Sequence, residues 1–407
     1  MPTPPPPSPT RSTASRLVAL GRGDRAGGIG LAGATLVALV WANWPGSLSY
    51  QITWGSIPRL STSLGLHLTW RGWVNDALMV GFFALVGLEI RREMTVGELR
   101  SWRRSATPIL AAAAGMLVPA LLYLAILHGQ AGSRGWGIPM ATDVAFALGA
   151  LALVVPGASP RTRVFLMTLA VADDIGSVIV LVCFYSQHVS VGALVLGLLC
   201  LALMGVSAWR GWLPPSAPLV LGAATWWAFV HAGVEPAVVG VAVGLCLPER
   251  LPRGSRPTPR QLERGPRHRE QQLEPWVNLL ILPVFALANA GLRLAGSGIG
   301  TSAALTVLVA VVIARVVGKL AGITGATTAV TRLAGPGYDP RLPARQHVVV
   351  GALGSVGFTV PLLIIQAALP PGSLTVAATA GLLIGTVLGI AVAALVARSA
   401  RRPARLL

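Results

Sequence analysis

The chain has 407 residues, of which 54% are hydrophobic and only 11% are charged. A soluble domain carries about 25% charged residues, so this composition excludes an ordinary soluble protein and indicates a polytopic membrane protein. The formal net charge of +18 would indicate a nucleic-acid partner only if the basic residues were not confined to the loops between apolar spans.

A membrane-spanning helix needs about 20 predominantly apolar residues. Twelve stretches of the sequence are candidates, and the short seventh and eighth are separated only by HAG. Numbered in chain order as spans 1 to 12, they cover residues 26–44, 73–90, 106–128, 137–155, 163–185, 190–208, 216–230, 234–247, 276–292, 302–323, 346–369 and 374–397. The pattern predicts an all-α polytopic membrane domain over residues 26–398.

Polar segments flank and divide this domain. Residues 1–25 begin with MPTPPPPSPTRSTAS, a composition that predicts a disordered tail. The segment lacks the layout of a cleavable signal peptide. The first external loop, residues 45–72, contains SYQITW, for which we predict a short strand. An arginine-rich loop, residues 248–275, separates span 8 from span 9, and residues 399–407 form a second tail.

The arginines are distributed unevenly between the two sides of the membrane. With the N-terminus placed in the cytoplasm, the cytoplasmic segments contain 26 arginines and the external loops contain 4. Because cytoplasmic loops collect basic residues, this distribution predicts twelve spans with both termini cytoplasmic. Attraction to the anionic inner leaflet explains the net charge. We therefore expect membrane lipids, and no nucleic acid, as partners.

Charged residues lie in the middle of three spans. Span 5 contains VADDIG with Asp173 and Asp174, span 4 contains Asp143, and span 10 contains Lys319, the single lysine beside 31 arginines. Each such charge costs roughly 2.5–3.5 kcal/mol at mid-span, so all four must face the interior of the bundle and find partners or water. A purely structural ion pair would account for one aspartate with Lys319 and would leave two aspartates without a clear counter-charge.

The types of these residues point to ion exchange. Adjacent helical residues point about 100° apart, so Asp173 can meet a lysine on another helix while Asp174 lines a cavity, or the reverse. A carboxylate in a low dielectric beside a like charge can exchange protons near neutral pH, and its oxygens also suit Na+ or Li+. A desolvated lysine can also lose its proton, which a guanidinium effectively cannot, although one lysine could be retained by chance.

Glycine and proline interrupt spans 4 and 11. Span 4 reads PMATDVAFALGALAL, with Thr142 beside Asp143, and span 11 reads VVVGALGSVGFTVPLLII, with Gly354, Gly357 and Pro361. Such interruptions in corresponding spans indicate broken helices around a binding site. Close helix packing would explain either glycine run alone. The two spans are seven apart and run in opposite directions, as an inverted repeat requires.

Several stretches of the chain resemble the NhaA family of sodium/proton antiporters. They are WVNDALMVGFFALVGLEIRRE, IPMATDVAFALGALAL, FLMTLAVADDIGSVIVLVCFYS, PWVNLLILPVFALANAGL, GKLAGI and GSVGFT, which occur in family order from about residue 30 to 398. The combination of ATDxAFALG and ADDxG is highly specific. The resemblance implies twelve helices in inverted repeats, with spans 4 and 11 broken and crossing near the middle of the membrane.

The resemblance also implies roles for the buried residues. Asp174 would be the principal ligand of the cation, and Asp173 would lie close to it and be able to pair with Lys319. Thr142 and Asp143 would lie at the crossing of the broken spans, where Asp143 compensates the dipoles of the helix ends.

A second group of acidic residues would take part in the response to pH. The resemblance places Glu89, Glu93 and Glu270, with Glu274 nearby, in a cytoplasmic funnel. For the first two, which lie among arginines in GLEIRREM, the residues alone support interfacial ion pairing and the attraction of cations to an entrance equally well. Glu235 begins span 8 in GVEPA, where the family often has a histidine in GVHAT, and we assign it to the same response.

The implied activity is electrogenic exchange of cytoplasmic Na+ or Li+ for external H+ by a homodimer in the bacterial inner membrane. Such a protein is not an enzyme and needs no cofactor beyond the ions that it transports. A carrier of organic solutes on a related fold would need a larger polar cavity. An intramembrane aspartyl protease would need two aspartates on separate helices and a GxGD-type motif, whereas here the pair is adjacent and no span contains that motif.

Overall fold

The computed structural model describes residues 24–45, 48–95, 102–185, 190–210, 214, 216–246, 269–293, 296–333 and 342–399. Every regular element in these ranges is a helix. The predicted tails and the loop between spans 8 and 9 fall mainly outside the described residues. The described end of that loop, residues 269–275, is helical, so helix is present seven residues before the start expected for span 9.

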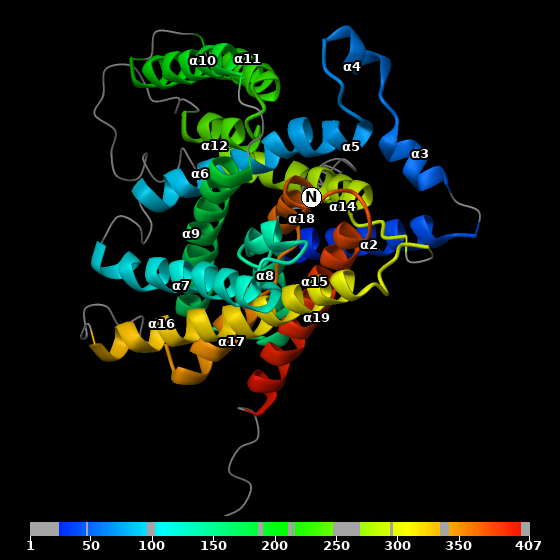
Figure 1. Cartoon of the computed structure of the whole chain (residues 1–407). Coiled ribbons are helices and arrows are strands. Elements are labelled where there is room, and N and C mark those ends of the chain that lie inside the picture. Colours follow the sequence, from blue (N-terminus) through cyan, green and yellow to red (C-terminus); the bar gives the residue numbers. More distant parts are fainter. Residues whose placement is uncertain are drawn as a thin grey trace, which may run out of the picture.

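The helices follow one another along the chain with short connections (Figure 1). The first half contains α2 Asp24–Asn43, α3 Ser49–Gly55, α4 Arg59–Ser63, α5 Trp70–Gly72, η1 Trp73–Leu78, α6 Met79–Thr95, α7 Trp102–Leu127, η3 Ser133–Gly137, α8 Val144–Val154 and α9 Pro160–Tyr185. The second half contains α10 Val191–Arg210, α11 Ala217–Ala232, α12 Ala237–Cys246, η4 Val277–Ile281, α14 Leu282–Asn289, α15 Ser302–Ile313, η5 Ala314–Gly318, α16 Lys319–Leu333, α17 Ala344–Gly354, α18 Thr359–Ala368 and α19 Ser373–Ser399.

The prediction of a strand in the first external loop is wrong, because SYQITW forms most of helix α3. The backbone N–H of Ile52 donates to the carbonyl of Leu48 at 2.9 Å, which is a helical hydrogen bond. The rings of Tyr50 and Trp54 lie 6.5 Å apart, whereas a strand would separate them by about 13 Å. Tyr50 also donates to the carbonyl of Leu287 at 2.8 Å. Packing against a distant helix therefore outweighs the β propensity of the segment.

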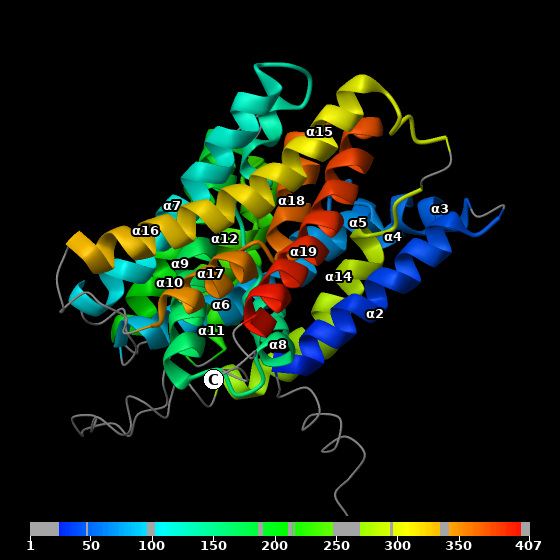
Figure 2. The same ribbon diagram turned by 90° about the horizontal axis from the view of Figure 1, so that it is seen from below.

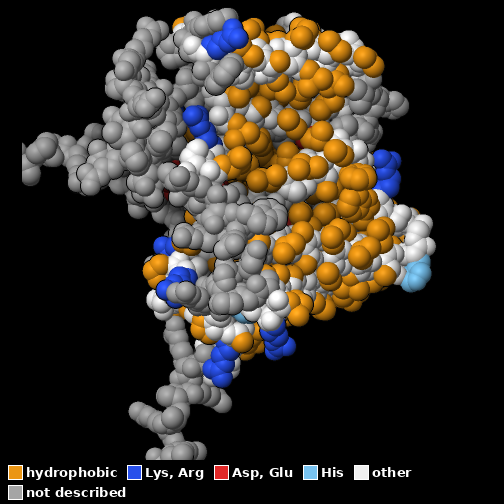
Figure 3. Space-filling model, turned by 90° about the vertical axis from the view of Figure 1, so that its left-hand side faces the viewer, with side chains coloured by type: hydrophobic (Ala, Val, Ile, Leu, Met, Phe, Trp, Pro, Cys, Tyr) orange, Lys and Arg blue, Asp and Glu red, His pale blue; other side chains and the backbone are white. Residues whose placement is uncertain are grey.

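Long apolar helices and an apolar surface indicate a helical multi-pass membrane protein. Five helices in the described ranges are long and apolar enough to cross a membrane, or six if α17 and α18 form one bent span. In Figure 3, hydrophobic side chains cover most of the described part of the face, and basic side chains lie mainly toward its edges. The number of twelve spans stays a prediction.

Helix α9 lies in the middle of the molecule and contacts α6, α7, α8, α12, α17 and α18 (Figure 1). Helices α15 and α16 join through η5 into one continuous helix, Ser302–Leu333, which packs against α7 and lies beside α17 and α19 (Figure 2). The central position of α9 removes the side chains at its middle from the surrounding solvent or lipid.

Regular α-helical geometry is interrupted inside several apolar segments. The π-helical turns η1, η4 and η5 lie within longer helices, and such turns are frequent at functional sites. Residues 138–143 connect η3 to α8 without forming a helix. Residues 355–358 separate α17 from α18, and the axes of these two helices differ by 46°. The two non-helical segments contact each other, because the N–H of Asp143 donates to the carbonyl of Val356 at 3.0 Å.

Candidate functional site

The two adjacent aspartates of α9 lie in the centre of the protein. The side chain of Asp173 is 0% exposed and that of Asp174 is 1% exposed. Because neighbouring positions on a helix point about 100° apart, the two carboxylates meet different surroundings. The site is therefore built from one carboxylate with a charged partner and one without.

Lys319 is the partner of Asp173. Its Nζ lies 2.5 Å from Asp173 Oδ2 and donates to Thr142 Oγ1 at 2.7 Å, and the lysine is 0% exposed. The hydroxyl of Thr142 in turn donates to the carbonyl of Gly354 at 2.6 Å. This chain of contacts joins α9, α16, the segment before α8 and the end of α17 at one point.

Asp143 lies where the two non-helical segments meet. It is the N-cap of α8, and its Oδ1 accepts from the N–H of Phe146 at 3.1 Å. Its Oδ2 accepts from the hydroxyl of Thr359, the first residue of α18, at 3.1 Å. The N-terminus of a helix carries a partial positive charge, so this carboxylate is placed between two such ends and stabilises both.

Asp174 differs from the other buried carboxylates because neither of its oxygens has a hydrogen-bond partner among the described residues. Asp173 Oδ1 and the hydroxyl of Ser177, one turn further along α9, are unpartnered in the same sense. The charges of Asp173, Asp143 and Glu89 repel an ionised Asp174, while that of Lys319 attracts it. Buried polar oxygens without partners are unfavourable unless a proton or a cation satisfies them.

Two further residues of this site, Arg315 and Thr359, had no role predicted from the sequence. Arg315, in η5, is 0% exposed and donates to the carbonyl oxygens of Ile138 at 3.3 Å and Ala141 at 2.9 Å. Thr359 bonds to Asp143 as described above. The signal for Arg315 was its position inside an apolar span, four residues before Lys319. Thr359 is the last residue of the GSVGFT stretch, which supported the family resemblance without giving this threonine a role.

The predicted helix-breaking residues lie at the break between α17 and α18. Gly354 is the last residue of α17 and Gly357 lies within the break. A Cβ atom at Gly357 would be 2.6 Å from the carbonyl oxygen of Ala141 and would also meet the guanidinium of Arg315, so the close approach requires glycine. Pro361 is in the first turn of α18, where its missing N–H is tolerated.

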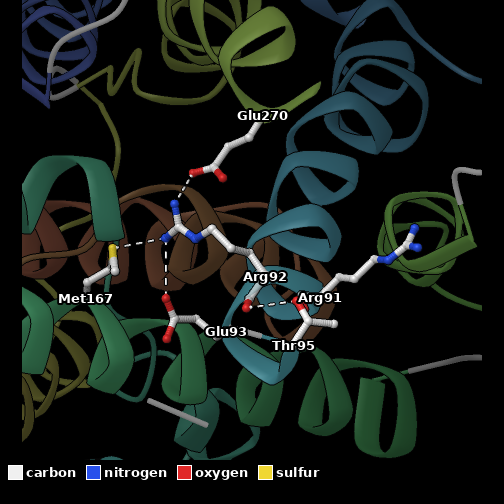
Figure 4. A network of polar contacts seen from close by, with 6 residues as sticks. All are labelled: Arg91, Arg92, Glu93, Thr95, Met167 and Glu270. Atoms are coloured by element: carbon white, nitrogen blue, oxygen red, sulfur yellow. Dashed lines mark hydrogen bonds and ion pairs between the residues drawn. The ribbon is translucent and has the colours of Figure 1, made fainter. Parts of the chain in front are cut away.

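A separate group of charged residues surrounds Arg92, near the end of α6 (Figure 4). Its Nη1 lies 2.7 Å from Glu270 Oε1, and its Nη2 lies 3.4 Å from both Glu93 Oε1 and the sulfur of Met167. Arg91 points to the opposite side of α6. Arg92 thus links α6 to the helical segment that begins at residue 269 and to α9.

Two other predicted acidic residues lie within electrostatic reach of this Arg92 cluster, which we define as Arg92, Glu93 and Glu270. Glu89 is one turn before Glu93 on α6, and its charge acts on all three members and on Glu274. The charge of Glu89 also acts on Asp174. Glu89 therefore lies within electrostatic range of both the Arg92 cluster and Asp174.

Glu235 is not brought to the Arg92 cluster. It is half-buried in the connection between α11 and α12. A Cβ atom at Gly240 would lie 2.5 Å from the carbonyl oxygen of Val80, and one at Gly244 would lie 2.9 Å from the backbone nitrogen of Leu88. Helices α6 and α12 therefore run in the same direction, which places Glu235 near the start of α6 and the Arg92 cluster at its end.

A cavity of about 570 Å³ lies away from the aspartates, between α3, α14, α18 and α19. Its lining includes Arg71 and Arg293 and no carboxylate, so it offers a cation no charged ligand. No group of three or more His, Cys, Asp or Glu side chains in the described ranges is arranged to hold a metal ion. The candidate ligands for a small cation are consequently the unpartnered oxygens on α9.

Comparison with known proteins identifies the family. The profile described as Na+/H+ antiporter 1 matches residues 19–397. The chain is 37% identical to "Na(+)/H(+) antiporter NhaA 3" of Frankia alni, covering 87% of this chain and 82% of that protein. It is 40% identical to "Na(+)/H(+) antiporter NhaA" of Acidovorax sp., covering 90% and 88%. A longer relative, "Na(+)/H(+) antiporter NhaA 1" of Mycolicibacterium vanbaalenii, is 37% identical, and the match covers 87% of this chain and 61% of that protein.

These matches confirm the resemblance inferred from ATDxAFALG and ADDxG. The profile includes every described helix that carries a residue of the candidate site, from α6 to α18. Together with the apolar helices, the matches show a multi-pass membrane protein whose relatives transport ions. The chain belongs to the NhaA family of Na+/H+ antiporters.

Proposed function

We propose that this chain exports Na+ or Li+ in exchange for external H+, with the cation and protons competing for Asp173 and Asp174. The observation that carries the proposal is the unpartnered carboxylate of Asp174, buried beside a carboxylate that is already paired with Lys319. Carboxylate oxygens are suitable ligands for a small hard cation. Protonation of the same oxygens removes the charge that attracts the cation, so the two ligands exclude each other.

Lys319 serves as an internal competitor in this mechanism. Its ammonium group occupies Asp173 in the absence of the transported ion, at a distance of 2.5 Å. A cation that binds both aspartates weakens that ion pair, which favours the loss of a proton from the desolvated lysine. Binding of external protons restores the pair. At acid pH, protons outcompete Na+ and the cycle stops.

Alternating access in this proposal depends on twelve spans with both termini in the cytoplasm of a bacterial inner-membrane protein. Spans 4 and 11 break at residues 138–143 and 355–358 and cross near the middle of the membrane, so rocking of one bundle against the other exposes the site to each side in turn. Movement of more protons than sodium ions per cycle makes the exchange electrogenic. The working unit is a homodimer. No catalytic residue and no cofactor take part.

The pH response belongs, in this proposal, to acidic residues at the cytoplasmic end of α6. The support is the ion pair of Arg92 with Glu270 and the action of the charge of Glu89 on Asp174. Protonation of this group changes the field at the cation site without direct contact. Glu235 lies at the other end of α6, so its part in the pH response is an independent one at the external side.

The experiment is dequenching of a pH-sensitive dye in inverted vesicles on addition of Na+, Li+ or K+. We expect a response to Na+ and Li+ that Asp174→Asn abolishes, and a displaced pH profile in Lys319→Arg. Ser302→Ala, in the first turn of α15, is a control that should leave the response unchanged. No response of the unmodified protein to any cation from acid to alkaline pH would reject the proposal and favour an organic-solute carrier.

A further inference from the structure

Arg315 is a fully buried cation that has no part in the mechanism proposed above. It is 0% exposed and is among the largest side chains with so little exposure in the described ranges. Burial of a guanidinium is strongly unfavourable unless its charge and its donors are compensated. The surroundings of Arg315 therefore identify what it compensates.

Its hydrogen bonds go to the C-cap of η3, Ile138, and to Ala141 in the non-helical segment that follows. The carbonyl oxygens of Ile138 and Ala141 accept from Nη1 at 3.3 Å and from Nη2 at 2.9 Å. The carbonyl end of a helical segment lacks intrahelical donors and carries a partial negative charge. Asp143 occupies the opposite kind of position, at the positive N-terminal ends of α8 and α18. The break before α8 is thus bordered by a charge of the appropriate sign at each end, and Asp143 also lies at the start of α18.

The position of the guanidinium is fixed by close packing. A Cβ atom at Gly357 would collide with the guanidinium group, and a Cβ atom at Gly385 would lie 3.2 Å from Cδ of Arg315. Glycines on α19 and in the break therefore provide the room that the arginine occupies. Movement of this side chain requires movement of the break itself.

Arg315 also changes the charge balance of the buried site. Three carboxylates, those of Asp143, Asp173 and Asp174, and two cations, Lys319 and Arg315, are buried together. Three negative and two positive charges give a net charge of −1 when all are ionised, whereas Lys319 alone would leave −2. The charge of Arg315 acts on Asp173 and Asp143. Because a guanidinium effectively does not lose its proton, this contribution stays constant.

We propose that Arg315 is a positioning residue of the cation site that weakens cation binding through its fixed charge while it holds residues 138–141 in place. As long as Lys319 keeps its proton, a site of net charge −1 is neutralised by a single monovalent cation. A site of −2 would hold Na+ more tightly and release it more slowly. The inference rests on the proposed function, because it concerns the affinity of the ion that Asp173 and Asp174 would bind.

The test compares Arg315→Gln, Arg315→Met and Arg315→Lys by calorimetric titration of purified protein with Na+ and Li+ at alkaline pH, where proton competition is weakest. The two neutral variants lose a positive charge close to the buried carboxylates, which should tighten Na+ binding by about tenfold. Arg315→Lys retains the charge and should stay within about threefold of the unmodified affinity. Arg332→Gln removes an exposed arginine from the same continuous helix and should change nothing.

Transport in proteoliposomes then separates affinity from turnover. We expect a lower half-saturating Na+ concentration and a lower maximal rate in the neutral variants, and a preserved half-saturating concentration in Arg315→Lys. Unchanged Na+ affinity in folded neutral variants, or an equal shift in Arg315→Lys, would overturn the inference. If neither neutral variant folds while Arg315→Lys does, the charge serves stability and the inference is rejected. Absence of Na+ binding and exchange in the unmodified protein would instead reject the proposed function.

Discussion

The ion pair between Asp173 and Lys319 allows a quantitative test of how the buried charges are balanced. Lys319→Met removes the ammonium group but keeps a side chain of similar length. Asp173 then loses the partner at 2.5 Å, and the hydroxyl of Thr142 loses a donor. Both members of the pair are 0% exposed, so solvent does not screen the change. We expect the variant to be strongly destabilised.

The magnitude follows from the cost of leaving one buried charge uncompensated. Removal of one member of a buried ion pair costs about 3–5 kcal/mol, and the remaining charge of Arg315 favours the lower end of that range. At about 2 °C for each kcal/mol in a chain of this size, the unfolding temperature should fall by about 6–10 °C. The loss should be largest at alkaline pH, where Asp173 is ionised, and should shrink when acid protonates its carboxyl group.

The assay is thermal unfolding of the purified protein in detergent, measured for both single variants and for the double variant Asp173→Asn with Lys319→Met. The double variant removes both charges and should recover to within about 1 kcal/mol of the unmodified protein. Thr168→Val is the control, because the hydroxyl of Thr168 is buried on α9 and has no partner in the part of the chain that the structure describes, so its removal should cost little. A stable Lys319→Met, or a double variant no more stable than the singles, would refute the reasoning.

Two further predictions concern the break and the Arg92 cluster. Gly357→Ala should destabilise the protein by about 1–3 kcal/mol and reduce transport, because the added Cβ would lie 2.6 Å from a facing carbonyl oxygen. Gly33→Ala on α2, where nothing lies within 4 Å, should be neutral or stabilising in the same melting assay, and equal effects of the two would contradict the packing argument. Arg92→Gln should move the pH of half-maximal exchange upward by about half a unit, because it removes the cation paired with Glu270. Arg91→Gln is the matched control, and an unchanged or acid-shifted profile in Arg92→Gln would argue against the cluster.

Much of the site could be anticipated from the sequence because a charged residue in an apolar span has few acceptable surroundings. The divergence of Asp173 and Asp174 follows from the geometry of any α-helix. The family followed from local motifs that survive in order along the chain, and the comparisons confirm it. Both inferences depend on residues close together in sequence.

The features that were missed depend on contacts between distant segments. SYQITW is helical because Tyr50 packs against a carbonyl 237 residues away, which no local propensity reveals. Arg315 bonds to carbonyl groups 174 and 177 residues away. Because most arginines lie in the loops, Arg315 inside span 10 was an exception to the topology pattern and was not considered as part of the site. By contrast, the predicted topology already placed Glu235 at the outer end of span 8 and Glu93 at the inner end of span 2.

Because of the π-helical turn η5, the cation site depends on the number of residues between its side chains as well as on their identity. A π-helical turn contains one more residue than the α-helical turn that it replaces. Arg315 lies within this turn and Lys319 directly follows it, so their side chains point in directions, relative to each other, that an uninterrupted α-helix would not produce. Deletion of a single apolar residue from this turn would leave every ligand in the sequence. It would nevertheless rotate Lys319 by about 100° about the helix axis, away from Asp173. Searches for functional relatives by ligand identity alone would accept such a protein, although its lysine could not reach the carboxylate.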